Sequence, residues 1–292
     1  MKKNLLITNP LSGKYKKDKV DSFSQKLRKI GLEVSKIELK KDQKIKGILE
    51  NLPVDEYETV FLAFGDGTIN SAINAIAARD DFFKFKICIV PFGTANVLAN
   101  ELGTNTTSKV IKAIKKNQVK KLHLGKVINL DDKSERYFSL MASSGFDSMV
   151  VSKINEKVKE KFGKFAYIQK LFSTIIRRYF PPLKTQIGNR KYKSILTCVS
   201  NGKYYGGRIH VSDSKLDDNS FNVILIKKFS VISILEYIIT RKTNKNIIRM
   251  KAKNVKIMSD NPNYPLQMDG DCYGNLPVKI ENTNKFINVI YL

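Results

Sequence analysis

The sequence predicts an α/β protein of two domains: a domain built on a parallel sheet over residues 1–122, and a mainly antiparallel, β-sandwich-like domain over residues 123–292. Two observations predict this. Strand-like apolar runs alternate with helix-like amphipathic stretches in the first part, whereas short β-rich runs separated by turn residues follow one another in the second. The length of 292 residues agrees, because it is long for one core and suits two. We leave open whether the C-terminal segment packs back on the first domain.

In the first part, the apolar runs are short enough for strands and the stretches between them have the helical period. The expected strands are residues 4–8, 33–39, 59–64 and 86–90, and the expected helices are 18–30, 44–52 and 68–78. Strictly alternating strands and helices favour a parallel sheet, in which ligands bind at the carboxyl ends of the strands.

In the second part, turn residues separate the apolar runs and only two helices are expected. The strands are expected at residues 127–130, 135–142, 193–200, 208–211, 221–226, 256–259 and 285–290. The longer helix is expected at 153–179, because its apolar residues recur at the helical period and Pro181 and Pro182 follow it. A shorter helix is expected at 230–240.

The chain is strongly basic. It has 52 Lys and Arg against 27 Asp and Glu, a formal net charge of +25, which favours nucleotides, nucleic acid or acidic lipids as partners, although a lysine-rich genome gives the same balance with no special partner. Three widely spaced cysteines and two histidines argue against a disulfide framework or a zinc site and favour a reducing cytosol. No apolar run approaches about 18 residues, so any membrane contact should be peripheral.

Two glycine-bearing segments point to chemistry. Residues 64–70 read Phe-Gly-Asp-Gly-Thr-Ile-Asn and residues 91–96 read Pro-Phe-Gly-Thr-Ala-Asn, and each lies between an expected strand and a helix-like stretch. Glycine lets backbone N–H groups approach a phosphate, and such loops cradle anions at helix N-termini. A single Gly-Asp-Gly is more often a turn without a ligand. The pair reverses that preference and predicts the phosphate-binding loops of a kinase.

Six segments in the same order resemble the bacterial diacylglycerol kinases and sphingosine kinase-like lipid kinases, which are relatives of the NAD kinases and phosphofructokinases. The segments are residues 9–13, 65–70, 91–103, 144–147, 215–221 and 267–271. The resemblance covers essentially the whole chain and implies ATP bound between the domains, with Mg²⁺. The residues implied for ATP are Asn9, Pro10, Leu11, Ser12, Gly13, Phe64, Gly65, Asp66, Gly67, Thr68, Ile69, Asn70, Gly93, Thr94 and Asn96.

The resemblance also implies the catalytic acids and a metal turn. Asp271 matches the general base of the family, and Asp66 matches the acidic residue of the phosphate loop; a kinase needs one group to take the hydroxyl proton and others to balance phosphate charge. The Asp218 carboxylate, with the backbone carbonyls of Lys215 and Ser220, matches a structural Mg²⁺ site of hard oxygen donors. Read alone, both acidic strings are more often plain solvated turns.

Three positions depart from the family. Phe64 stands where glycine is usual, which implies either a loop that tolerates the ring or a changed nucleotide affinity. Asp271 stands where glutamate is usual, so its carboxylate is one methylene shorter, and Asn219 replaces a glycine of the metal turn, a mild change because Asn tolerates the left-handed conformation. None of the three removes a required functional group.

The implied acceptor is the hydroxyl of a membrane lipid such as diacylglycerol or a sphingoid base. Lysines and an apolar stripe over residues 153–184 would suit the anionic inner face of a membrane, and would equally suit an ordinary helix with a solvated side. We therefore expect a cytoplasmic, peripherally attached enzyme; a homodimer is compatible, and no nucleic acid is expected. The alternatives are a kinase with a soluble acceptor, as in NAD kinases, and a catalytically weak basic protein that binds anionic lipid or nucleic acid.

Overall fold

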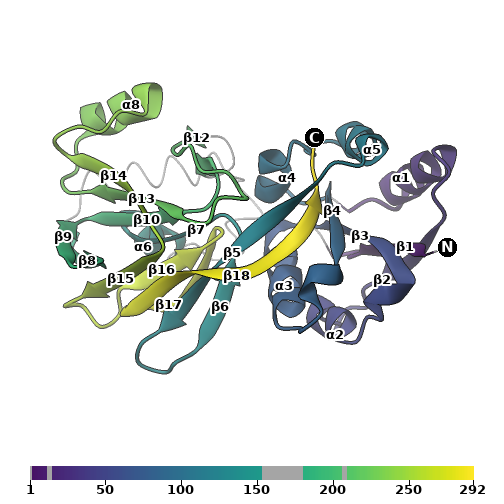
Figure 1. The fold of residues 1–292 in the computed structure, drawn as a ribbon, viewed down its shortest axis with the longest axis horizontal. Helices are drawn as coiled ribbons and strands as arrows, with labels where there is room; N and C mark the ends of the chain where they lie inside the picture. Colours follow the sequence, from purple (N-terminus) through teal and green to yellow (C-terminus); the bar gives the residue numbers. More distant parts are fainter. Residues whose placement is uncertain (1, 12–14, 153–179, 206–208) are drawn as a thin grey trace. The chain divides into compact units, whose positions relative to one another are not determined.

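The computed structural model describes residues 2–11, 15–152, 180–205 and 209–292. The chain divides into two compact units, one of Met1–His123 with Asn284–Leu292 and one of Leu124–Thr283. The expected helix at 153–179 and the phosphate-loop residues Ser12 and Gly13 lie outside the described residues. Figure 1 shows the elements of both units.

The first unit is built on a parallel sheet, as the alternating pattern predicts. Its strands are β1 (Lys3–Thr8), β2 (Val34–Glu38), β3 (Tyr57–Phe64) and β4 (Lys86–Pro91), in the order β2-β1-β3-β4. The end of β18 (Val278–Ile290) pairs parallel to β4 through Asn288 and Val289. Because all of these strands run the same way, the loops after β1, β3 and β4 leave from one edge of the sheet.

Helices cover this sheet on both faces (Figure 1). Helices α1 (Lys17–Lys29) and α5 (Thr107–Lys116) pack on one face, through a core that includes Phe23, Phe61 and Val110. Helices α2 (Ile45–Glu50) and α3 (Asp66–Ala77) lie on the other. A short α4 (Val97–Glu101) and the 3-10 turns η1 (Val54–Glu56) and η2 (Phe82–Lys84) complete the unit. The sequence reading missed α5, although Thr106 caps it by accepting from the Lys109 amide.

The second unit is β-rich and antiparallel, which confirms the predicted fold class. One sheet has six strands in the order β14-β13-β10-β7-β16-β17. These are β14 (Ile247–Ala252), β13 (Phe221–Ile226), β10 (Leu196–Ser200), β7 (Met141–Gly145), β16 (Pro265–Met268) and β17 (Asp271–Asn275). The remaining longer strands are β5 (Val119–Asn129), β6 (Glu135–Phe138), β8 (Leu183–Ile187), β9 (Arg190–Ser194) and β15 (Asn254–Ser259). A buried core that includes Phe138, Phe221, Ile257 and Tyr264 joins strands of both sets.

The small elements of the second unit are α6 (Phe146–Val151), α8 (Val231–Thr240), β11 (Tyr204–Tyr205) and β12 (Ile209–His210). Helix α8 matches the expectation of a helix at 230–240, and Ser230 is its N-cap. No helix in the described part of the chain combines the length and the apolar character needed to cross a membrane.

Two strands that the sequence reading predicts as continuous are each two strands. The run 135–142 breaks into β6 and β7 because the amides of Ser139, Leu140 and Met141 donate to the Asp269 carboxylate. The run 193–200 breaks at Ile195, where the chain passes from β9, which pairs with β8, to β10, which pairs with β7 and β13. Both breaks depend on partners that lie far away in the sequence, which is why the local pattern did not predict them.

Candidate active site

The two predicted glycine loops lie directly against each other in the first unit. A Cβ atom added at Gly93 would lie 2.5 Å from the Gly65 Cα, 2.9 Å from Asn96 Oδ1 and 3.3 Å from the Phe64 carbonyl oxygen. Cβ atoms do not approach other atoms this closely, so only glycine fits at position 93. A Cβ at Gly65 would lie an ordinary 3.7 Å from the Gly93 Cα. The close packing of the loops therefore requires glycine at 93 more strictly than at 65.

Side chains also tie the two loops together. Asn96, at φ 51°, closes the second loop, because its Oδ1 accepts from the Gly93 amide at 2.8 Å and its Nδ2 donates to the Gly93 carbonyl at 2.8 Å. Asp66 Oδ1 accepts from the Val97 amide at 2.7 Å, the first residue of α4. Asp66 thus fixes the second loop to the first and caps α4.

The start of α3 keeps the features of an anion-binding turn. Its N-cap is Gly65, which has no side chain to cap the first amides, and the first intrahelical bond there is Ile69 N–H to the Gly65 carbonyl at 3.0 Å. Gly67 is exposed, whereas Ile69 and Asn70 are buried. The first-turn N–H groups have no partner within a helix, and together with the helix dipole they favour a negative group at this end of a 12-residue helix.

Phe64 does not expose its ring to the loop. It is the last residue of β3 and is 1% exposed. Phe61 and Ala63 belong to the core under α1 and α5, so the alternation along the strand directs Phe64 to the face of α2 and α3. Position 64 is not among the described residues with positive φ, so a bulky side chain fits the strand there without strain.

The remaining nucleotide residues predicted in this unit lie at the same edge of the sheet. Asn9 follows β1 and accepts the Leu11 amide on its Oδ1 at 2.9 Å, and Leu11 is 66% exposed. Thr94 is exposed at the tip of the second loop. The structure therefore brings the segments 64–70 and 93–97 into contact and places Asn9, Pro10 and Leu11 after the neighbouring strand β1.

Asp271 begins β17, immediately after a tight hairpin turn in the second unit. Asp269 and Gly270 form the turn with φ of 49° and 92°, the signature of a type I′ turn. The Asp269 carboxylate accepts from the amides of Ser139, Leu140 and Met141 and from the Ser139 hydroxyl, all at 2.8–2.9 Å. Four hydrogen bonds to one carboxylate hold the turn in place, and the turn holds the half-buried Asp271.

A buried polar cluster supports the other side of the hairpin. Gln267 in β16 accepts the Gly270 amide on Oε1 at 2.9 Å and donates from Nε2 to Ser143 Oγ at 2.6 Å. Ser143 donates to Asp147, which also accepts from Tyr205 at 2.9 Å and from the Ser148 amide at 2.6 Å. Asp147 is 1% exposed. Burial raises the pKa of the Asp147 carboxyl, and the hydrogen bonds it accepts only partly offset that effect.

The predicted metal turn is closed by its own hydrogen bonds. The Asp218 amide donates to the Lys215 carbonyl at 2.8 Å, and Asp218 Oδ2 accepts from the Lys215 amide at 3.1 Å. Lys251 Nζ lies 3.8 Å from the same Oδ2, so a cation already faces this carboxylate. Among the described residues there is no cluster of three or more His, Cys, Asp or Glu side chains that could hold a metal ion. The donors predicted at this turn are the Asp218 carboxylate and the backbone carbonyls of Lys215 and Ser220, which are hard oxygen ligands of the kind that Mg²⁺ accepts.

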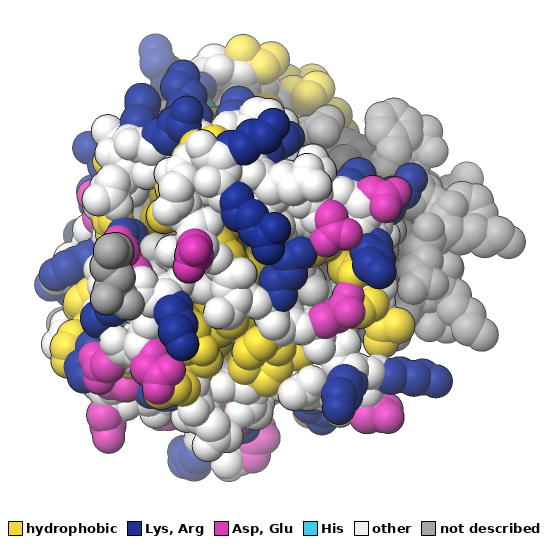
Figure 2. Space-filling model, turned by 90° about the vertical axis from the view of Figure 1, so that its right-hand side faces the viewer, with side chains coloured by type: hydrophobic (Ala, Val, Ile, Leu, Met, Phe, Trp, Pro, Cys, Tyr) yellow, Lys and Arg dark blue, Asp and Glu magenta, His cyan; other side chains and the backbone are white. Residues whose placement is uncertain are grey.

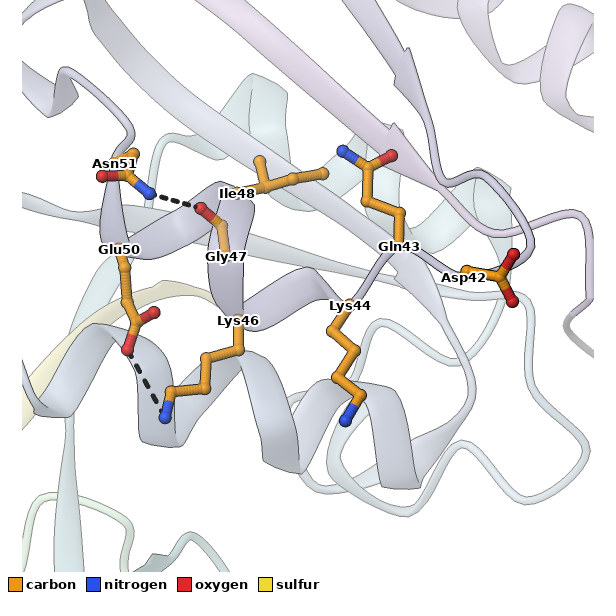
Figure 3. A pocket seen from close by; sticks show the side chains of 8 residues that line it. All are labelled: Asp42, Gln43, Lys44, Lys46, Gly47, Ile48, Glu50 and Asn51. Atoms are coloured by element: carbon orange, nitrogen blue, oxygen red, sulfur yellow. Dashed lines mark hydrogen bonds and ion pairs between the residues drawn. The ribbon is translucent and has the colours of Figure 1, made fainter.

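The surface has a hollow that none of the predicted site residues lines. This hollow of about 690 Å³ is lined by one short segment around α2, in which Lys46 Nζ lies 3.6 Å from Glu50 Oε1 (Figure 3). It includes none of the predicted nucleotide residues. On the face seen in Figure 2, Lys and Arg side chains are spread widely and interspersed with Asp and Glu, so the net charge does not gather into one patch on that face.

The sequence reading missed the residues that hold Asp271. Asp269, Gln267 and Asp147 lie in the segments 267–271 and 144–147 that resemble the family, but the sequence predicts no role for any of them. The Asp-Gly pair at 269–270 is a hairpin signal that could have predicted the turn. Nothing in the sequence indicates the partners of the Asp269 carboxylate, because they lie 128 to 130 positions away.

Comparisons with known proteins match both halves of the chain. The family model of the diacylglycerol kinase catalytic domain matches residues 3–127, and that of the YegS C-terminal NAD kinase beta sandwich-like domain matches residues 140–291. The diacylglycerol kinases of Staphylococcus aureus strains JH9 and Newman are 28% identical over 300 residues, which covers 99% of this chain and 92% of theirs.

Solved structures from Bacillus anthracis str. Sterne share the fold. One, provisionally described as a diacylglycerol kinase, superposes with a TM-score of 0.79 at 23% identity and covers 100% of this chain and 95% of its own. Another, described as a diacylglycerol kinase, gives a TM-score of 0.72 at 20% identity and covers 100% and 97%. At these identities the likeness concerns the fold.

Proposed function

This chain belongs to the family of diacylglycerol kinase-like lipid kinases and is an ATP-dependent lipid kinase; we propose that its acceptor is the hydroxyl of a diacylglycerol-type lipid at an anionic membrane surface. The observation that carries the nucleotide half of the proposal is the contact between the two glycine loops at the carboxyl ends of β3 and β4. The S. aureus relatives are named diacylglycerol kinases, which supports diacylglycerol as the first acceptor to test.

In the proposed reaction, the ATP phosphates lie against the first turn of α3 and the second glycine loop. The acceptor oxygen forms a bond to the γ-phosphorus, the bond from that phosphorus to the β,γ-bridging oxygen breaks, and ADP leaves. Asp271 takes the proton of the acceptor hydroxyl as general base. Asp66 keeps the two loops in register through the Val97 amide.

Mg²⁺ would supply charge neutralisation for the phosphates, as in other kinases. In the second unit, the Asp218 carboxylate with the carbonyls of Lys215 and Ser220 is the set proposed to hold a structural Mg²⁺. Since Lys251 Nζ already lies 3.8 Å from Asp218, we propose that this ammonium moves away when the ion binds.

The test measures transfer of label from ATP, in Mg²⁺, to dioleoylglycerol, sphingosine or NAD, with the lipids in detergent micelles. We expect labelled phosphatidic acid, and we expect Asp271→Asn to lower kcat by at least about a hundredfold, the usual size of a general-base contribution. The matched control is Asp131→Asn, an exposed turn aspartate of the same unit. Label in NAD alone would identify a soluble-acceptor kinase. No label in any acceptor would contradict the proposal and favour the alternative of a catalytically weak basic protein that binds anionic lipid or nucleic acid.

A further inference from the structure

Helix α8 carries an apolar stripe on its outer face. Val231, Ile232, Leu235 and Ile239 are 40%, 80%, 50% and 74% exposed. Leu235 lies four residues after Val231, three after Ile232 and four before Ile239, so the four side chains lie along one side of the helix. The other large apolar side chains that are exposed in the described part of the chain, Leu11, Phe83 and Val119, are scattered singly. A concentration of exposed aliphatic residues on one helix indicates an interaction surface.

The rest of the unit holds α8 firmly, so the stripe cannot turn inward. Tyr237 is buried and donates its hydroxyl to the Val211 carbonyl at 2.5 Å. Ser233 faces the same way; its carbonyl accepts from Asn244 Nδ2 at 3.0 Å, and its hydroxyl accepts from Asn246 Nδ2 at 2.8 Å. Figure 1 shows α8 outside the six-stranded sheet, beside β14.

Exposed cations flank both ends of the stripe. Lys227 and Lys228 precede the helix, and Arg241, Lys242 and Lys245 follow it. The two flanks are joined, because the Lys227 amide donates to the Asn246 carbonyl at 2.8 Å. Within the described part of the chain the four lysines form no ion pair, and Arg241 Nε lies 3.9 Å from Asp213. The one acidic residue of the helix, Glu236, accepts from Asn244 at 2.9 Å.

We propose that α8 docks this protein on an anionic lipid bilayer. The stripe enters the boundary between headgroups and acyl chains while the flanking lysines contact headgroup phosphates, which is how short amphipathic helices bind membranes. The inference rests on the proposed function, in which the acceptor lies in a bilayer. It identifies the outer face of α8 as the surface that contacts this bilayer.

Other occupants fit the surface less well. A second copy of the chain, docked through the same stripe about a two-fold axis, would bring basic flanks against basic flanks. Nucleic acid would satisfy the lysines but would find no aromatic ring in the stripe on which bases could stack. An anionic lipid surface matches both features, because its acyl chains accept the aliphatic side chains and its headgroup phosphates attract the flanking cations.

The test is sedimentation of the full chain with vesicles of equal parts phosphatidylglycerol and phosphatidylcholine. We expect the variant I232Q/L235Q/I239Q to bind at least about tenfold more weakly than the parent, because glutamine keeps the helix and removes the apolar face. The matched control is Val119→Gln, at an exposed valine of the first unit, which should bind like the parent. Thermal melts establish that each variant is folded.

A second pair of variants separates the cations from the stripe. Lys228→Gln with Lys242→Gln should lower the affinity for these vesicles and flatten its dependence on salt, while Lys109→Gln with Lys112→Gln on α5 should change neither. Vesicles of phosphatidylcholine alone should bind the parent weakly.

Kinase activity on a short-chain diacylglycerol dissolved as monomers distinguishes this inference from the proposed function. The α8 variants should keep their activity within about twofold, and a parent inactive on every lipid would refute the function while leaving vesicle binding measurable. A parent that does not bind the vesicles, or a triple variant that binds like the parent, would overturn the inference. So would a dimer of the parent, measured by sedimentation velocity, that the triple variant loses.

Discussion

The acidic turns around Asp66 in the first unit and Asp271 in the second are held in opposite ways. Asp66 belongs to one of two loops whose backbones pack closely, and the contact depends on the absence of a side chain at Gly93. Asp271 follows a turn that is held by side chains, chiefly the carboxylate of Asp269. The first arrangement should fail when an atom is added, and the second when an acceptor is removed. This difference predicts which substitutions damage each turn.

Removing the Asp269 acceptor should have the largest effect. Asn also tolerates the φ of 49° at position 269. Its NH₂ group, however, cannot accept from the backbone amides of Ser139, Leu140 and Met141, which belong to buried residues. We expect a loss of about 3 kcal/mol in the free energy of unfolding, measured by urea denaturation, because buried donors are left unsatisfied. Asp131→Asn should change it by less than about 0.5 kcal/mol. A small effect at Asp269 would mean that the turn does not depend on this carboxylate.

Adding a methyl group to the glycine contact should have the next largest effect. Gly93→Ala forces apart the Gly65 and Asn96 segments and should cost about 1–3 kcal/mol of stability, the usual range for overpacking. Calorimetric ATP affinity should also fall, since the two loops separate.

The matched control is Gly47→Ala in α2, where an added Cβ meets no atom within 4 Å and helix propensity favours alanine. It should leave ATP binding unchanged. Equal ATP affinity in the Gly93→Ala and Gly47→Ala variants would contradict the role of the loop contact.

The smallest effect concerns pH. The pKa of buried Asp147 is raised above its unfolded value, so its contribution to stability is fully present below about pH 4 and is lost as the pH rises through the folded pKa. Asp147→Asn removes this dependence, and the variant should become more stable relative to the parent as the pH rises above about 4, until the folded pKa of Asp147 is passed. Urea denaturation at several pH values measures the difference.

Asp21 provides the control of opposite sign. Its hydrogen bond and charge interaction with Lys36 lower its pKa, so the stabilisation it gives is lost as pH falls. Asp21→Asn should therefore change stability relative to the parent in the opposite direction with pH. A difference between parent and Asp147→Asn that stays constant with pH would contradict burial as the dominant influence on Asp147.

Local pattern predicted most elements of the first unit and part of the second. The strand at 59–64 and the helix at 68–78 appear as β3 and α3, and 230–240 appears as α8, within two residues at each end. The pattern missed β8, β14, β16 and β17 and joined the strands that break at Ser139 and Ile195. Antiparallel strands are specified by partners distant in sequence, and a period of two along one strand does not identify them.

By itself, the sequence determined the fold class, the two glycine loops and the family, because each depends on residue types at fixed local spacing. Tertiary structure decided which glycine is sterically required, that Phe64 is buried on the face of α2 and α3, and that Asp269 and Gln267 hold the turn before Asp271. It also showed that the apolar residues of α8 lie on its outer side. These are properties of distance and burial, which arise only when segments far apart in the chain pack together.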